Sequence, residues 1–371
     1  IMVFEDNVKR FGFRCMRLPL NSDKTINTEE MNKMVDLFIN AGFTYFDTAH
    51  GYHGGLSEKA VKTCLTDRYD HSQFTLTDKL TGTYFQTREE IRPLFFSQLE
   101  LCGVKYFDYY LMHAQDRRSF EHFKKCHAYE EALKLKEEGY IKHVGLSFHD
   151  KAEVLEEILD TYPWIEVVQI QFNYLDMESD IIQSKALYDL VTSRGIPLII
   201  MEPVKGGSLA NLPAKAKAVF DAISDASPAS FALRYVANFK NNRMILSGVS
   251  NISQMEDNLK TLADPKPLSE AELQAIEEVK QIILKEKLIP CTACAYCTAG
   301  CPKHINIPEL FKLLNKASLG EWYNLSNEYR ALIETSGKAS ECIKCGKCEN
   351  ICPQHLEIRS LLEMVKKTFE K

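Results

Sequence analysis

The feature that most constrains the fold is a pair of cysteine runs with identical spacing. The pattern Cys-x2-Cys-x2-Cys-x3-Cys-Pro occurs at residues 291–302 and again at 342–353. Disulfides are a poor explanation, because cysteines this close together rarely reach disulfide geometry and cytosolic thiols stay reduced. Zinc sites usually take separated Cys-x2-Cys pairs from two loops. Three thiols on one tight loop with a fourth just beyond therefore indicate a metal centre of a different kind from a zinc site. Zinc stays the alternative.

This run resembles the one by which bacterial ferredoxins hold 4Fe-4S clusters, in which the fourth cysteine of each run binds the other cluster. The resemblance implies two 4Fe-4S clusters with crossed ligand sets. The first set is Cys291, Cys294, Cys297 and Cys352, and the second is Cys342, Cys345, Cys348 and Cys301. The other four cysteines are scattered and are predicted to be ordinary buried thiols.

An internal repeat extends beyond the cysteines. CPKHINIPELFKLL (301–314) matches CPQHLEIRSLLEMV (352–365), so each half is predicted to be a cluster loop followed by an amphipathic helix. The proline after each run suits the first position of that helix. The repeated histidines, His304 and His355, are predicted to cap or lie on the surface, with metal ligation as the alternative. The segment between the runs is mostly helical in pattern, which resembles the α-helical type of ferredoxin domain.

Composition excludes several classes of partner. The 371 residues are 45% hydrophobic and 26% charged, with a formal net charge of -6 and no long run of like charge. This argues against nucleic acid and against an acidic membrane surface as the main partner. No apolar stretch reaches the length of a membrane span, and no secretory signal pattern opens the chain. We expect a cytoplasmic protein that binds neither nucleic acid nor membranes.

The first part of the chain alternates β-branched apolar runs with helical patterns. Such alternation implies parallel βαβ units, and eight of them imply an α/β fold, a closed (β/α)8 TIM barrel. We predict a barrel at 1–265, a helical linker at 266–288 and the cysteine module at 289–371. The opening segment VFEDNVKRFGF is predicted to form a hairpin that closes the bottom of the barrel. The predicted strands are 11–18, 43–49, 74–80, 107–113, 141–148, 167–173, 196–204 and 244–250.

The active site of a TIM barrel lies at the C-terminal ends of its strands. Asp47 and the nearby Tyr52 follow the second predicted strand, and Lys79 and His113 end the third and fourth. Together these groups have a chemical logic: the carboxylate holds the ammonium, and the ammonium stabilises the phenolate form of the tyrosine. Tyr52 could then protonate a carbonyl oxygen as hydride reaches the carbon, with His113 orienting that oxygen. Each residue alone is more simply explained as a helix cap, a solvated strand end or a core residue. Four such residues at three consecutive strand ends favour a catalytic site.

The barrel sequence resembles the aldo/keto reductase family, in the branch with a C-terminal 4Fe-4S domain. The resemblance rests on AGFTYFDTAHGYHGGLSEKAV, TDKL, DYYLMH, GLSFH, VQIQFN, MEPVKGG and SGVSNISQMEDN. It implies that Asp47, Tyr52, Lys79 and His113 are the catalytic tetrad. By position it also implies a nicotinamide nucleotide site lined by Ser147, Gln169, Met201, Lys205, Gly206, Ser250, Gln254 and Asn258.

The sequence departs from the family pattern in the predicted nucleotide site. The usual Ser-Asn pair is Ser147-Phe148, the usual stacking aromatic is Met201, and the arginine that commonly grips the 2′-phosphate is Gln254. The expected cofactor is therefore NADPH or NADH, with a flavin as a further alternative.

Three functions are compatible with these features. In the first, the barrel reduces a small aldehyde or ketone with NAD(P)H, and the clusters shape the module or dock a redox partner protein. In the second, the clusters feed electrons to a flavin or activated substrate in the barrel. In the third, an electron-transfer protein carries a nucleotide-sensing barrel. The tetrad disfavours the third, and the resemblance favours the first.

Overall fold

The computed structural model describes residues 3–4 and 8–370, and the chain divides into two compact units. The first comprises Ile1–Pro203 and Ala229–Leu268, and the second comprises Val204–Pro228 and Ser269–Lys371. The second unit thus combines a segment that follows the seventh strand with the C-terminal residues of the chain. The boundaries at 265 and 288 that the sequence suggests stay a prediction, and the two units are described separately below.

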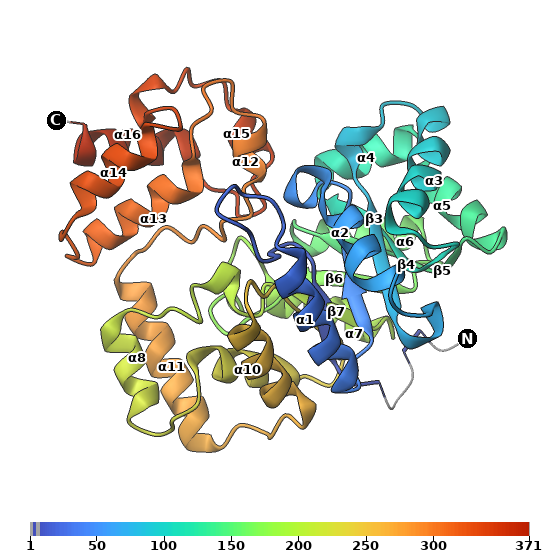
Figure 1. Cartoon of the computed structure of the whole chain (residues 1–371), viewed down its shortest axis with the longest axis horizontal. Helices are drawn as coiled ribbons and strands as arrows, with labels where there is room; N and C mark the ends of the chain where they lie inside the picture. Colours follow the sequence, from blue (N-terminus) through green and yellow to red (C-terminus); the bar gives the residue numbers. More distant parts are fainter. Residues whose placement is uncertain (1–2, 5–7, 371) are drawn as a thin grey trace. The chain divides into compact units, whose positions relative to one another are not determined.

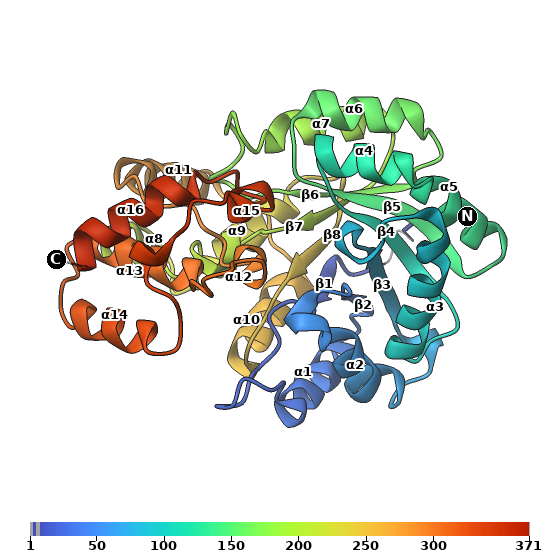
Figure 2. The same ribbon diagram turned by 90° about the horizontal axis from the view of Figure 1, so that it is seen from above.

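The first unit is a closed barrel of parallel strands, in which β1 pairs with both β2 and β8 (Figures 1 and 2). Each predicted strand is present, so the (β/α)8 prediction is confirmed; the strand ends differ by a few residues. The first strand ends at Arg14 and not at the predicted residue 18, because the chain turns away from the barrel after Arg14. The strands are β1 Phe11–Arg14, β2 Tyr45–Asp47, β3 Thr75–Leu80, β4 Phe107–Gln115, β5 Ile141–Phe148, β6 Val167–Gln171, β7 Leu198–Met201 and β8 Asn242–Ser247.

Helices surround this barrel on the outside (Figure 2). The helical pattern at 122–139 corresponds to parts of two helices rather than one. The helix is interrupted at His127, whose backbone is left-handed with a φ of 52°. The α-helices of the first unit are α1 Thr28–Asn40, α2 Ser57–Val61, α3 Ile91–Cys102, α4 Arg117–Lys125, α5 Ala128–Glu137, α6 Ala152–Thr161, α7 Ser184–Ser193, α9 Pro228–Ala237 and α10 Ile252–Ala263.

Aromatic packing closes the N-terminal end of the barrel. The ring of Phe4 stacks on Tyr109 with a centroid separation of 5.2 Å, and Val3 and Val8 pack on the same cluster. The Tyr109 hydroxyl also donates a hydrogen bond to the carbonyl oxygen of Val3. Residues 5–7 of the predicted hairpin lie outside the described residues, so that hairpin stays a prediction.

The second unit is helical. Its first pair, α8 Ala214–Asp221 and α11 Glu270–Lys285, pack together, and α11 lies where the sequence predicts a helical connection. Leu310, Phe311 and Leu362 belong to the core of the C-terminal part. The remaining α-helices are α12 Tyr296–Ala299, α13 Ile307–Ser318, α14 Leu325–Ile333, α15 Lys347–Asn350 and α16 Ile358–Phe369.

The internal repeat is visible in the backbone of the second unit. Left-handed residues occur at equivalent places in the two halves: Ala293 and Lys344, Ala295 and Gly346, His304 and His355. The repeated histidines are exposed, and their backbone N–H groups close turns onto Cys301 and Cys352.

The prediction that the proline after each cysteine run occupies the first position of a helix is wrong. Pro302 and Pro353 lie in turns, and the helices that follow begin at Ile307 and Ile358. The left-handed histidine two residues after each proline interrupts the chain before a helix can begin.

Within the described residues, no helix combines the length and the apolar character needed to cross a membrane.

Candidate functional site

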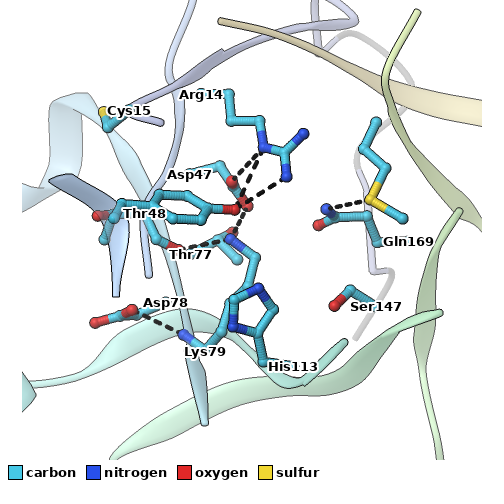
Figure 3. Close-up of polar contacts among 12 residues, drawn as sticks. Arg14, Cys15, Asp47, Thr48, Thr77, Asp78, Lys79, His113, Ser147 and Gln169 are labelled. Carbon is cyan, nitrogen blue, oxygen red and sulfur yellow. Dashed lines mark hydrogen bonds and ion pairs between the residues drawn. The ribbon is translucent and has the colours of Figure 1, made fainter. Parts of the chain in front are cut away.

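Asp47 and Lys79 form a buried ion pair at the C-terminal end of the barrel (Figure 3). Asp47 ends β2 and Lys79 is the penultimate residue of β3. The Lys79 ammonium lies 2.8 Å from Asp47 Oδ2, and both side chains are fully buried. The same ammonium donates a 2.6 Å hydrogen bond to the carbonyl oxygen of Thr48. These contacts fix the ammonium in place, because a buried charge is stable only where it is paired and hydrogen-bonded.

Tyr52 and His113 lie against this ion pair. The Lys79 ammonium is 4.9 Å from the centroid of the Tyr52 ring, and the His113 ring lies edge-on at a centroid distance of 6.0 Å. Tyr52 is nearly fully buried in the short turn that follows β2. The structure therefore brings the four predicted tetrad residues together, while their catalytic roles stay a prediction.

His113 is held in its neutral form. Its Nδ1 lies 2.7 Å from the Thr81 hydroxyl oxygen. Burial, followed by the positive charges of Lys79, His149 and Arg14, keeps the pKa of His113 well below its ordinary value. A neutral imidazole carries one donor nitrogen and one acceptor nitrogen, so it can donate a hydrogen bond to a carbonyl oxygen without carrying charge.

Arg14 is part of this site, although no motif of the sequence predicts it. It ends β1 and pairs in register with Asp47. Its guanidinium donates two hydrogen bonds to the Tyr52 hydroxyl oxygen, from Nη2 at 3.1 Å and from Nε at 3.3 Å. Its Nε also lies 3.8 Å from Asp47 Oδ1, and Nη1 donates to Glu202 Oε1 at 3.4 Å. Two cations and two carboxylates therefore surround the tyrosine.

A second buried group of acids lies behind Lys79. Glu58, Asp78 and Cys102 bring one ligand atom each to within 4.8 Å of one another. These residues also make hydrogen bonds to their neighbours: Gln98 donates to Glu58 at 3.1 Å, and the Lys79 backbone N–H donates to Asp78 at 2.8 Å. Burial and then the neighbouring Glu58 raise the pKa of Asp78 well above its ordinary value. This group is therefore held by hydrogen bonds within the protein, beside the strand that carries Lys79.

Three of the residues predicted to bind nucleotide are buried on neighbouring strands, Ser147 on β5, Gln169 on β6 and Met201 on β7. Ser147 on β5 accepts a 2.7 Å hydrogen bond from the Ala114 backbone N–H. Gln169 on β6 donates to the Met201 sulfur at 3.4 Å, and its buried Oε1 has no hydrogen-bond partner among the described residues. An unsatisfied buried amide oxygen is costly, and a ligand donor would satisfy it.

The residues predicted near the phosphates make contacts within the protein. Asn258 donates to the Ser247 hydroxyl oxygen at 2.9 Å. Gln254 accepts from the Ser250 backbone N–H at 2.8 Å, and the Ser250 hydroxyl donates to the Arg17 carbonyl oxygen at 2.9 Å. The loop before α10 is thus braced by the side chain expected to replace the phosphate-binding arginine.

Lys205 and Gly206 belong to the second unit. Gly206 has a φ of 64°, and a Cβ there would lie 2.3 Å from the carbonyl oxygen of Thr292, the residue after Cys291. This glycine lets the loop after β7 pack against the first cysteine loop. A role for Lys205 and Gly206 in nucleotide binding stays a prediction.

The eight cysteines of the repeats line two cavities in the second unit. One is lined by Cys291, Cys294, Cys297 and Cys352, and the other by Cys301, Cys342, Cys345 and Cys348. Apolar side chains make up much of the remaining lining, including Phe311 and Ile358 in the first cavity and Ile305 and Leu362 in the second. Four thiols around an apolar cavity fit the ligand requirement of a 4Fe-4S cluster. The cavities mix the two runs in the crossed manner that the ferredoxin pattern implies.

Comparison with known proteins agrees with both halves of the chain. The aldo/keto reductase family matches residues 15–281, and a 4Fe-4S dicluster domain matches residues 290–356. The fold and the family match define an oxidoreductase built on a (β/α)8 barrel. The chain belongs to the aldo/keto reductase family, as its sequence motifs indicate.

Individual relatives are distant. An uncharacterized oxidoreductase of Schizosaccharomyces pombe is 24% identical over 274 residues, covering 68% of this chain and 81% of the relative. An aldo-keto reductase from Bacillus halodurans in its holo form superimposes with a TM-score of 0.59 at 23% identity, covering 73% of this chain and 92% of that one. A Klebsiella pneumoniae aldo/keto reductase in complex with NADP and acetate has a TM-score of 0.59 at 17% identity, covering 74% and 92%. At these identities the solved structures support the fold.

The neutral state of His113 predicts a pH dependence of stability. An unfolded histidine binds a proton below its ordinary pKa of about 6.5, whereas buried His113 does not. The free energy of unfolding should therefore fall as pH drops through 6.5. Between pH 7.5 and 5.5 this group should contribute about 1.4 kcal/mol of that fall. Urea unfolding at both pH values should show a correspondingly smaller loss in His113→Gln.

The exposed His127 provides the control for this experiment. His127→Gln should keep the pH dependence of the wild type. An equal loss of stability in His113→Gln and in the wild type would contradict the neutral, buried state of His113.

Proposed function

We propose that the barrel reduces an aldehyde or ketone by hydride transfer from a nicotinamide nucleotide, with Tyr52 as the general acid. The observation that carries this proposal is the buried Asp47–Lys79 ion pair against the Tyr52 ring, with His113 on the ring's edge. Reduction of a carbonyl develops negative charge on its oxygen, and this oxygen needs a proton from a positioned donor. Tyr52 is the donor that these contacts position.

The protein's own residues divide this work in a simple way. Tyr52 gives its proton to the carbonyl oxygen and is left as a phenolate, and the nearby Lys79 ammonium stabilises that negative charge. Neutral His113 orients the carbonyl oxygen by donating a hydrogen bond. Asp47 keeps Lys79 charged and in position.

The nicotinamide supplies the hydride when it is bound. The buried Oε1 of Gln169 fits such a ligand, because it lacks a partner and could accept from the carboxamide N–H of the ring. Ser147 and Met201 would form neighbouring walls, and Ser250, Gln254 and Asn258 lie on the segment that the family resemblance assigns to the phosphates. The nucleotide is NADPH or NADH, and Phe148, Met201 and Gln254 are the positions at which its predicted site departs from the family pattern.

We further propose that the second unit holds two 4Fe-4S clusters, one in each cysteine cavity, and that this module transfers electrons or docks a redox partner. Support comes from the four thiols of each cavity and from the dicluster match. Thiolate ligands require a reducing compartment, which agrees with the expectation of a cytoplasmic protein.

A second candidate is a flavin- or ferredoxin-linked reductase whose clusters feed the barrel site. Phe148 and Met201, which replace residues of the family pattern, favour it. A hydride carries two electrons and a cluster passes one, so this route needs an intermediate carrier.

Replacing Tyr52 with phenylalanine should remove the proton donor, together with the oxygen that accepts two hydrogen bonds from Arg14. We expect kcat/KM for reduction of a panel of small aldehydes and ketones to fall by about 10²–10⁴-fold. The dissociation constant for NADPH or NADH should stay within about twofold of the wild type, because the lost hydroxyl oxygen is already engaged by Arg14. Steady-state kinetics and fluorescence titration measure the two quantities.

Tyr323→Phe is the matched control, since Tyr323 is 95% exposed in the second unit and the same atom is removed. Its kcat/KM should stay near the wild-type value. Unchanged turnover in Tyr52→Phe would exclude Tyr52 as the general acid.

The crossed ligand sets predict an unusual result for pairs of cysteine variants. The wild type, purified anaerobically, should contain about eight irons and eight sulfides. Replacing Cys301 and Cys345 with alanine removes ligands from a single cavity, so about four irons should remain. Replacing Cys301 and Cys294 damages both cavities, so less than four irons should remain.

Iron and sulfide analysis separates the two arrangements. If each run held its own cluster, the outcomes for the two double variants would be exchanged. Zinc in place of iron in the wild type would contradict both arrangements.

A further inference from the structure

Arg14 makes contacts that the proposed function does not yet use. Its side chain is only 9% exposed, and its guanidinium directs two N–H groups at one atom, the Tyr52 hydroxyl oxygen. That oxygen is the atom from which the proposed reaction takes its proton. Lys79, by comparison, lies 4.9 Å from the centroid of the tyrosine ring and directs its shortest contacts at Thr48 and Asp47.

The chemistry of a guanidinium gives these contacts a direction. Arginine has five N–H donors and no acceptor, and it stays protonated in proteins. The tyrosine oxygen must therefore accept both hydrogen bonds from Arg14. A phenolate oxygen accepts more strongly than a phenol oxygen, because donor and acceptor then carry opposite charges. Arg14 consequently stabilises the state that Tyr52 reaches after it has given up its proton.

Carboxylates on two sides hold the guanidinium against the tyrosine. Asp47, on the neighbouring strand, lies 3.8 Å from Nε, and Glu202, directly after β7, accepts from Nη1 at 3.4 Å. Glu202 has a φ of 57°, a backbone conformation that is costly for a residue with a side chain, and its buried Oε2 has no hydrogen-bond partner among the described residues. Strain of this kind persists where the surrounding structure requires it.

We propose that Arg14 is a positioning residue for proton transfer: its two N–H groups hold the Tyr52 oxygen in place and stabilise its phenolate form, and Glu202 and Asp47 fix Arg14 for this task. In the direction of reduction, the O–H bond of Tyr52 breaks, its proton forms a bond to the carbonyl oxygen, and the carbonyl carbon gains the hydride electron pair from the reduced nucleotide. The phenolate then recovers a proton from water. Arg14 keeps its own protons throughout.

This inference deepens the proposed function, and its first consequence can be measured without substrate. The charged and titratable groups around the Tyr52 oxygen come from the ends of several strands. They are Arg14 on β1, Asp47 on β2, Lys79 on β3, His113 on β4 and Glu202 directly after β7. Replacing Arg14 with methionine keeps much of the apolar stem and removes both donors and the charge. Tyr52 should then ionise at a pH about one to two units higher than in the wild type.

Carbon-13 NMR of the full-length holoprotein, labelled at the ring carbon that bears the tyrosine oxygen, would follow this ionisation. Tyr52→Phe identifies the Tyr52 resonance by its loss. Arg14→Lys keeps the charge but loses the pair of N–H donors. The pH at which Tyr52 ionises in this variant should therefore lie between the values in the wild type and in Arg14→Met. Arg17→Met removes a cation three residues along the chain and should leave the Tyr52 titration unchanged. If Arg14→Met does not fold, Arg14→Gln replaces it, with the same expectation.

Kinetics then connect the ionisation to catalysis. In the reduction assay, the fall of kcat/KM at high pH marks the loss of the Tyr52 proton, so Arg14→Met should move that fall upward by the same one to two units. A purely structural role for Arg14 would lower activity without moving either pH profile. Identical Tyr52 titrations in Arg14→Met and the wild type would overturn the proposal. A shifted titration in a protein that reduces no carbonyl would support the role of Arg14 and reject the proposed reaction.

Discussion

The site depends on the ion pair between Asp47 and Lys79. Each side chain is fully buried, so each charge is tolerable only because the other lies 2.8 Å away. Breaking such a pair by removing one partner typically costs about 3–5 kcal/mol, since an uncompensated charge stays buried. The pair spans neighbouring strands, and parallel barrel geometry places both strand ends at one edge. The barrel therefore supplies the charge that the proposed reaction would need, and Arg14 and Glu202 add a second cation and a second carboxylate to the same network.

Much of the fold could be predicted from the sequence, because it depends on local patterns. Buried parallel strands produce apolar, β-branched runs, and every predicted run contains a strand of the barrel. The errors are at boundaries and breaks, where tertiary contacts decide. The break at His127 has no glycine or proline to mark it, and the turns after Pro302 and Pro353 depend on left-handed histidines that propensity does not favour. The two cysteine cavities, by contrast, have the crossed lining that the resemblance to bacterial ferredoxins implies.

A residue of the candidate site could be predicted from the sequence only where the end of its strand could be predicted. Asp47 and Lys79 lie at or beside the ends of β2 and β3, and the strand-end rule selects them. Arg14 escapes the same rule because the apolar run FGFRCMRL continues to residue 18, whereas the strand stops at Arg14. The sequence contains no signal for that stop: Ser57 bonds the Cys15 carbonyl and His53 accepts from the Leu18 N–H, and both partners are distant in sequence. Glu202 was missed for a related reason, since its predicted strand extends past β7.

The central claim is that the barrel transfers hydride to a carbonyl without needing electrons from the clusters. Anaerobic titration of the holoprotein with NADPH and with NADH tests it directly, by following the ultraviolet-visible spectrum with and without added aldehydes and ketones. The account predicts that the reduced nucleotide is oxidised only when a carbonyl is present, while the cluster absorbance stays constant. Bleaching of the clusters by nucleotide in the absence of a carbonyl, or the appearance of a flavin spectrum, would contradict it.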